Sequence, residues 1–200
     1  MKQGDVIFKE VFGKDWQELP LVLQKHYANR AYSDDAVVMQ GTMTIERNWF
    51  AKLLSPILYV IGALVPYDVR DIKTIVTARS RSNHIDYILD RHFQLPHGKI
   101  YQFKSNLVWQ GGNEMIEFMR FGIGWRCAFI WDGTKVQLQH KGYAWRIGKY
   151  VISLPVTWFL GCGYAEEIPE DDTNFNMKMT LKHPWWGEAY RYYGRFMVQS

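Results

Sequence analysis

Polar side chains interrupt the apolar faces of neighbouring predicted strands in the middle of this sequence. Arg91 and Ser105 each fall among alternating apolar residues, and so do Glu117 and His140 further along the chain. Successive side chains of a strand point to opposite faces of its sheet, so these four are expected to project into one interior. Tyr193, in the tyrosine-rich last predicted strand, completes the set of ligand-binding candidates.

An arginine at such a position permits three interpretations. A buried guanidinium needs a carboxylate or an anionic ligand group, because an unpaired buried charge is very costly. Arg91 could pair with Glu117 and only stabilise the fold, or it could hold the polar end of an amphipathic ligand together with His140. Alternatively, Glu117 or His140 could act as a general acid or base. The sequence leaves these alternatives open.

Motifs for metal, nucleotide or nucleophilic chemistry are not found in the 200 residues. There is no HxH or HExxH spacing, no P-loop, no GxSxG, and no GxGxxG between a strand and a helix. Cys127 and Cys162 belong to no CxxC or Cys/His cluster, so we expect neither a metal nor a cofactor. We interpret both as free, buried thiols of a reducing compartment, with a single disulfide as the alternative.

Long segments of alternating hydrophobicity must position the candidate residues. Gly111-Gly112-Asn113 and Asp132-Gly133 predict tight hairpins between such segments. Nine strands are predicted: 36–46, 71–81, 84–95, 99–110, 114–121, 125–131, 134–145, 175–181 and 188–198. Short turns favour antiparallel neighbours. We therefore predict an α+β, mainly β fold, a curved antiparallel sheet or barrel of lipocalin-like or helix-grip-like type with two to three helices packed on it.

Two helices are predicted in the first third of the chain. One spans 16–29, with Asp15 as its cap, and the other is the very apolar segment 48–65. The second contains a lysine, a proline and a glycine and is too short for a membrane span, so we expect a core helix. Attachment to a membrane surface is the alternative, but it favours a cationic polar face, which this helix lacks. Later, 154–160 is expected to be a loop or short helix, and 166–172 an exposed acidic loop.

Bulk composition narrows the class of protein. The 200 residues fit a single domain, 1–200, and 16% of them are aromatic, which is typical of proteins with a ligand cavity or an interface. The net charge of +4 comes from scattered basic residues, so we expect no nucleic-acid partner. The first ten residues form no apolar signal segment, and we infer a cytoplasmic location.

Short motifs along nearly the whole chain resemble a bacterial family, domain of unknown function 4166. They are Phe8-Lys-Glu-Val-Phe-Gly13 with Leu19-Pro20 and His26, Gly41, the apolar helix ending at Pro66, Asp90-Arg-His-Phe93, Phe103-Lys-Ser105, Glu117 to Gly122, Leu154-Pro155, and Pro184-Trp-Trp-Gly187 with Tyr193-Gly194. The resemblance names no catalytic residue. Members also occur behind NAD(P)-binding dehydrogenase-like domains, which implies an oxidoreductase partner or a substrate-holding role.

Three functions follow as hypotheses. The first is a binding module whose aromatic-lined cavity takes an apolar or amphipathic small molecule. The second is a small acid/base enzyme of cyclase, isomerase or hydrolase type. The third is a non-catalytic partner of a separate protein such as a dehydrogenase.

Overall fold

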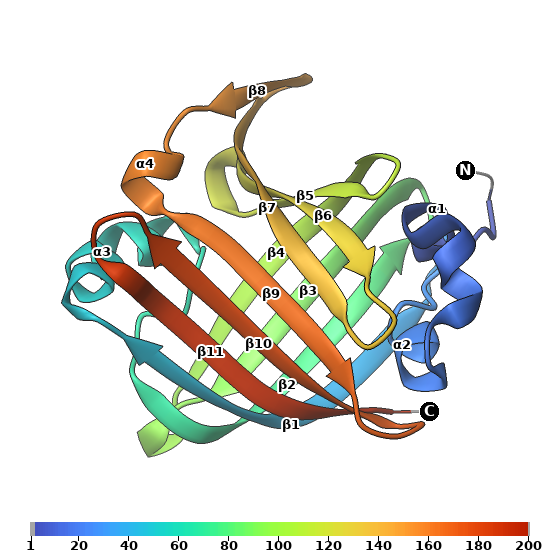
Figure 1. Ribbon diagram of the computed structural model, residues 1–200, viewed down its shortest axis with the longest axis horizontal. Coiled ribbons are helices and arrows are strands. Elements are labelled where there is room, and N and C mark those ends of the chain that lie inside the picture. Colours follow the sequence, from blue (N-terminus) through green and yellow to red (C-terminus); the bar gives the residue numbers. More distant parts are fainter. Residues whose placement is uncertain (1–2, 200) are drawn as a thin grey trace.

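A closed antiparallel β-barrel of ten strands forms the centre of the computed structural model, which describes residues 3–199 (Figure 1). The strands are β1 Ala36–Arg47, β2 Val69–Arg81, β3 His84–Gln94, β4 Ile100–Gly111, β5 Glu114–Phe118, β6 Ile123–Trp131, β7 Val136–Ile147, β8 Tyr150–Leu154, β9 Cys162–Pro169, β10 Asn174–His183 and β11 Gly187–Val198. Their order is β6-β5-β4-β3-β2-β1-β11-β10-β9-β7, and pairing of β6 with β7 closes the barrel. The eleventh strand, β8, pairs with β7 and projects from the wall. The predicted mainly β fold is confirmed.

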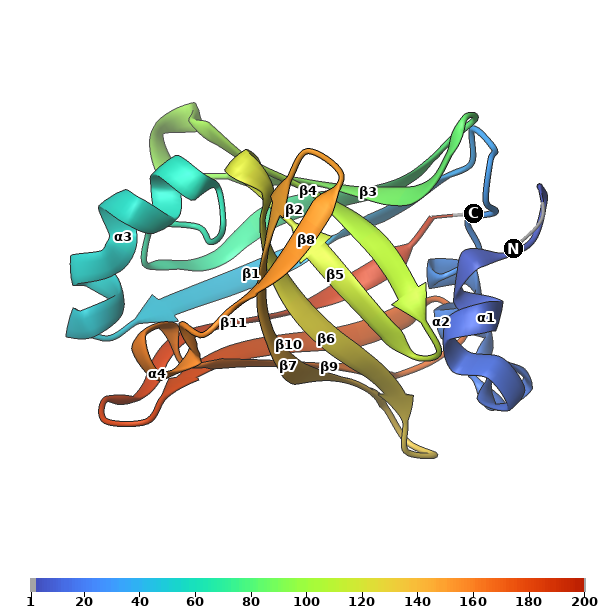
Figure 2. The same cartoon turned by 90° about the horizontal axis from the view of Figure 1, so that it is seen from above.

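Helices cover the two ends of the barrel (Figure 2). The helical segments are α1 Ile7–Phe12, η1 Gly13–Glu18, α2 Leu21–His26, α3 Trp49–Ile61, η2 Pro96–Gly98, η3 Arg120–Gly122 and α4 Thr157–Leu160. α1 and α2 lie at one end, while α3 and α4 lie at the other. One large apolar core joins the inward faces of both sets to the inward residues of the strands.

The prediction of one helix over 16–29 is wrong, because Pro20 divides that stretch. Pro20 has no N–H to donate and disfavours helical geometry in the residue before it, and Leu19 is accordingly extended, with φ −64° and ψ 134°. The structure has a 3-10 turn before the proline and α2 after it. Asp15 lies inside the 3-10 turn and does not cap a helix.

The apolar segment 48–65 forms the predicted helix, shortened to α3. Asn48 caps its start, with Oδ1 accepting a hydrogen bond from the Ala51 amide at 3.1 Å. Gly62 ends it in the left-handed conformation, with φ 63° and ψ 41°. Within residues 3–199, no helix combines the length and the apolar character needed to cross a membrane.

The acidic segment 166–172 was predicted as an exposed loop, but its first half belongs to β9. Alternation along β9 turns Gly163, Ala165 and Glu167 toward the interior, and all three are buried. Glu167 tolerates burial because other side chains satisfy it, as described below. β8 was also missed, so the structure has two more strands than the nine predicted.

Two glycines let β1 and β11 approach closely where the barrel wall bends. A Cβ on Gly41 would lie 2.0 Å from the carbonyl oxygen of Arg195, and one on Gly194 would lie 2.0 Å from that of Thr42. Real Cβ atoms do not approach backbone oxygens so closely, so any other residue would push these strands apart.

Candidate functional site

Two adjoining cavities of about 80 Å³ each occupy the barrel interior. The inner cavity extends toward α2, and the outer cavity lies beneath α3. Aromatic and aliphatic side chains form most of the lining of both cavities. The residues that line both cavities are Leu64, Phe103, Glu117, Trp125 and Tyr192.

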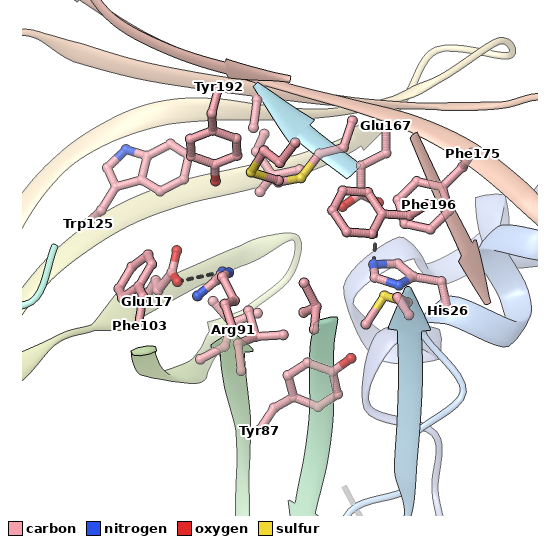
Figure 3. A pocket seen from close by; sticks show the side chains of 18 of the residues that line it. His26, Tyr87, Arg91, Phe103, Glu117, Trp125, Glu167, Phe175, Tyr192 and Phe196 are labelled. Atoms are coloured by element: carbon pink, nitrogen blue, oxygen red, sulfur yellow. Dashed lines mark hydrogen bonds and ion pairs between the residues drawn. The ribbon is translucent and has the colours of Figure 1, made fainter. Parts of the chain in front are cut away.

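Three predicted site residues contact one another, and two of them, Arg91 and Glu117, line the inner cavity (Figure 3). Nη2 of Arg91 lies 2.9 Å from Oε1 of Glu117, and Nη1 donates to Oγ of Ser105 at 3.0 Å. The Ser105 hydroxyl donates to the same Glu117 oxygen at 2.6 Å. Antiparallel pairing of β3, β4 and β5 brings the three together, because each lies on the inward face of its strand.

The cluster is charged and nearly enclosed. Arg91 and Ser105 are buried, and the Arg91 guanidinium lies 4.6 Å from the centre of the Phe103 ring. Burial alone would lower the pKa of Arg91, but the neighbouring Glu117 carboxylate outweighs it and the pKa is raised. Among the described residues, the two side-chain hydrogen bonds to Glu117 both end at Oε1, so Oε2 can accept from another donor.

A second polar cluster, which the sequence analysis missed, lies in the inner cavity. The Tyr27 hydroxyl donates a hydrogen bond to Oε2 of Glu167, and Nε2 of His26 lies 3.5 Å from the same oxygen. Burial would raise the pKa of Glu167, but His26 and Tyr27 together lower it. Burial, and then the Glu167 charge, raise the pKa of Tyr27 well above its usual range. In the sequence, Glu167 shares its strand parity with the small residues Gly163 and Ala165. This pattern could have indicated that the Glu167 side chain faces the interior.

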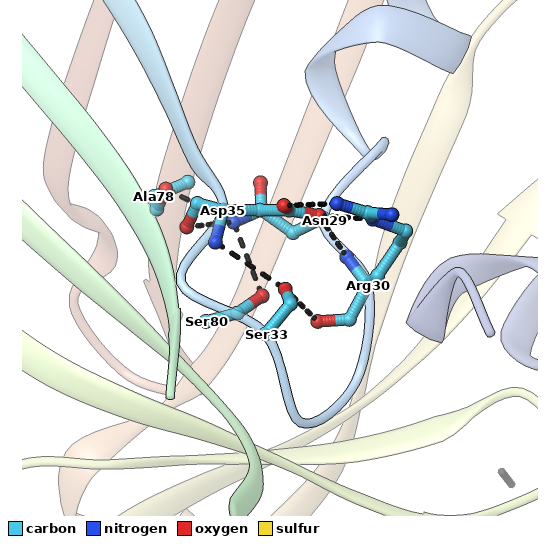
Figure 4. Close-up of polar contacts among 6 residues, drawn as sticks. All are labelled: Asn29, Arg30, Ser33, Asp35, Ala78 and Ser80. Carbon is cyan, nitrogen blue, oxygen red and sulfur yellow. Dashed lines mark hydrogen bonds and ion pairs between the residues drawn. The ribbon is translucent and has the colours of Figure 1, made fainter. Parts of the chain in front are cut away.

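Polar contacts attach the loop that follows α2 to the barrel wall (Figure 4). Asn29 is fully buried, and its Nδ2 donates to the carbonyl oxygens of Asp35 at 2.9 Å and Ala78 at 3.2 Å. Arg30 makes two hydrogen bonds of 2.8 Å to the Asp35 carboxylate. The Arg30 hydrogen bond lowers the pKa of Asp35 to about 2. The loop from α2 to β1 is thus attached to β2.

Polar atoms without protein partners line the inner cavity. Oη of Tyr87 and Nδ1 of His26 are buried and make no hydrogen bond within residues 3–199. Burial raises the pKa of Tyr87, so its phenol stays protonated and is a hydrogen-bond donor. Tyr192 lines both cavities, and burial raises its pKa to about 12. Buried polar groups are normally hydrogen-bonded, so the Tyr87 and His26 atoms can each still accept one further polar partner.

The other two predicted site residues lie elsewhere. Nδ1 of His140 accepts a hydrogen bond from Nε1 of Trp125 at 3.0 Å, and Nε2 lies 3.2 Å from Oγ1 of Thr157. Burial lowers the pKa of His140, and its ring lines neither cavity. Tyr193 is 38% exposed on the outer face, since strand alternation turns its neighbour Tyr192 inward instead. The structure therefore corrects both placements.

The cysteines lie outside this site. Cys127 and Cys162 are both free, as predicted, but only Cys127 is buried, and burial raises its pKa well above the usual range. The expectation that Cys162 is buried is wrong. In the described residues, no group of three or more His, Cys, Asp or Glu side chains is arranged to hold a metal ion.

Comparisons with known proteins place the chain in an uncharacterised family. The family model described as "Domain of unknown function (DUF4166)" matches residues 19–196. No match was found among curated proteins. Among solved structures, the chain is similar to "Crystal Structure of Rv2717c from M. tuberculosis", with 9% identity and a TM-score of 0.45 over 82% of this chain and 91% of that one. It is also similar to "Dehydratase domain of the polyketide PpsC from Mycobacterium tuberculosis", with 5% identity and a TM-score of 0.20 over 94% and 84%.

Proposed function

We propose that this chain, which belongs to the DUF4166 family, binds an apolar or amphipathic small molecule inside its barrel. One observation carries the proposal: the buried Tyr87 hydroxyl lines a largely apolar cavity and has no hydrogen-bond partner among residues 3–199. A buried hydroxyl that makes no hydrogen bond costs about 1–3 kcal/mol. A ligand that supplies a hydrogen-bond acceptor to this hydroxyl would recover that energy.

The electrostatics of the cavity favour a neutral polar group on the ligand. Glu117 already neutralises Arg91, so an anionic ligand would have to compete with a carboxylate held by two hydrogen bonds. A hydroxyl group instead has a free acceptor in Oε2 of Glu117, and donors are available on Tyr87 and Tyr192. The aromatic walls suit a flat or aliphatic body attached to such a group.

The acid/base alternative has less support. Its two candidate groups are separated, because Glu117 lines the cavities and His140 does not. Both hydrogen bonds to Glu117 hold it as an ion-pair partner of Arg91. An oxidoreductase partner, implied by the family resemblance alone, stays a prediction.

Native mass spectrometry of the freshly purified protein tests the proposal. We expect a species heavier than the bare chain, which loses a small molecule on collisional activation. The organic extract of the same sample should then identify that molecule as apolar with at most a few polar groups. A bare chain, together with no uptake of added octan-1-ol or 1-naphthol, would overturn the proposal.

A further inference from the structure

α3 is apolar on both of its sides. Its inner side packs on the core and lines the outer cavity through Phe50, Ala51, Leu54 and Leu58. Its outer side faces solvent, with exposed fractions between 56% and 69% for Trp49, Leu53, Ile57 and Val60. A helix that only covered a barrel end would carry polar residues on this outer side.

Aromatic residues from two other segments extend the exposed surface. The Trp186 ring centre lies 4.9 Å from that of Trp49, and those of Trp185 and Trp158 lie 6.3 Å apart. These segments, α4 and the β10–β11 turn, gather beside α3 at the barrel end opposite α1 and α2 (Figures 1 and 2). We call the four tryptophans and the outer side of α3 the end face. It exposes four of the nine tryptophans of the chain.

Cations flank the end face. The Arg120 side chain lies against Gly62 at the end of α3, and Lys182 precedes the β10–β11 turn. Neither makes an ion pair with a carboxylate of the described residues. Lys52, on α3 itself, forms an ion pair with Asp68, which also pairs with Arg47. The positive charge that the helix alone lacks is therefore supplied largely by neighbouring segments.

The exposed tryptophans and the flanking cations of the end face together fit one type of partner, a lipid surface. Tryptophan is enriched where proteins meet the boundary between lipid tails and head groups, and basic residues nearby are attracted to anionic head groups. A second copy of the chain fits less well, because a two-fold contact would place Arg120 and Lys182 of both copies around one interface and so concentrate like charges there. We propose that the end face docks on the surface of an anionic lipid bilayer.

Docking goes beyond the proposed function, since it requires no ligand in the barrel. It would, however, bring the outer cavity close to the lipid phase, because α3 lines that cavity with its inner side and belongs to the end face with its outer side.

Co-sedimentation with vesicles of phosphatidylcholine, with and without phosphatidylglycerol, tests the docking. The wild-type chain should bind the anionic vesicles, and added salt should weaken binding. Leu53→Ser with Ile57→Ser should reduce partitioning at least about tenfold. The matched control, Leu21→Ser with Met197→Ser, removes exposed apolar side chains at the opposite end and should bind like the wild type.

Brominated lipids give a second readout in the unmodified chain, because they quench only tryptophans that enter the bilayer. Quenching of part of the fluorescence is expected. Absence of binding to anionic vesicles, or equal binding by both double variants, would overturn the proposal. So would a dimer in sedimentation velocity that Leu53→Ser with Ile57→Ser abolishes while vesicles have no effect, since the end face would then be an interface between copies.

Discussion

Arg91 and Glu117 form an ion pair across the width of β4, with Nη2 2.9 Å from Oε1 and Ser105 bonded to both partners. Glu117 lines both cavities of the barrel interior, whereas Arg91 lines the inner one. The energetic role of the pair and its role toward a ligand can be separated by substitution.

Removal of one partner of this pair should be strongly destabilising. Glu117→Ala leaves the buried Arg91 guanidinium without its carboxylate, and we expect the free energy of unfolding to fall by about 3 kcal/mol or more in urea titrations. Glu170→Ala is the matched control, since it removes the carboxylate from the exposed pair with Arg195 and should cost at most about 1 kcal/mol. Equal effects of the two substitutions would show that the Arg91–Glu117 pair is as accessible to water as the exposed pair.

The Glu167 cluster should make stability depend on acidic pH. The pKa of Glu167 is lower in the folded chain than its usual value of 4.5, so the folded state releases this proton more readily than the unfolded one. The stabilisation is therefore complete above that value and is lost as pH falls through the lowered folded pKa. Urea unfolding from neutral to acidic pH should show this loss in the wild type. Glu167→Gln should flatten that part of the profile, and an unchanged profile would contradict the assignment.

Close contact between β1 and β11 should make Gly194 irreplaceable. In Gly194→Ala the new methyl group would meet the Thr42 carbonyl oxygen, and we expect a loss of about 3 kcal/mol or more in the free energy of unfolding. Gly98→Ala is the control, because its surroundings are open and only its positive φ of 75° is strained, which costs about 1–2 kcal/mol. Equal losses would indicate that the strands can separate without cost.

The unpartnered hydroxyl of Tyr87 predicts an unusual stability effect. Tyr87→Phe removes a buried donor that has no hydrogen-bond acceptor among residues 3–199, so without ligand the variant should be as stable as the wild type or slightly more stable. Tyr190→Phe, by contrast, removes a hydroxyl that donates to the Val65 carbonyl oxygen at 3.2 Å, and it should cost about 1 kcal/mol. Thermal unfolding of both variants, without ligand, measures the difference. A clear loss of stability in Tyr87→Phe would mean that the hydroxyl already has a partner.

Strand alternation was sufficient to predict the mainly β fold and the inward positions of Arg91, Ser105 and Glu117. This prediction succeeded because successive residues of a strand point to opposite faces of the sheet. In these strands one set of alternate residues is mostly apolar, which identifies the inward face. Tyr193 was misplaced although it shares its parity in β11 with Arg191 and Arg195, which indicates the outer face, because the number of tyrosines was given more weight than their parity. The side chain of Tyr192 is the one that reaches the cavity.

The remaining errors come from contacts between distant segments. A glutamate such as Glu167 is usually exposed to solvent. Its burial is explained by its contacts with His26 and Tyr27, which lie about 140 residues away in the sequence. His140 has the inward parity of its strand, yet Trp125 and Thr157 bind both of its ring nitrogens. Local patterns contain no information on such partners. The cationic flanks of the end face likewise come from segments that the helix pattern does not include.

Binding of 1-naphthol to the wild type and to Tyr87→Phe tests the central claim most directly. Naphthalene, which lacks the oxygen, should bind both proteins equally, and Tyr193→Phe serves as the control for an outward-facing tyrosine. We predict that Tyr87→Phe weakens 1-naphthol binding at least about fivefold, the equivalent of one hydrogen bond of about 1 kcal/mol, and leaves naphthalene binding unchanged. Equal affinity of all three proteins for 1-naphthol, or no binding by any of them, would contradict the account.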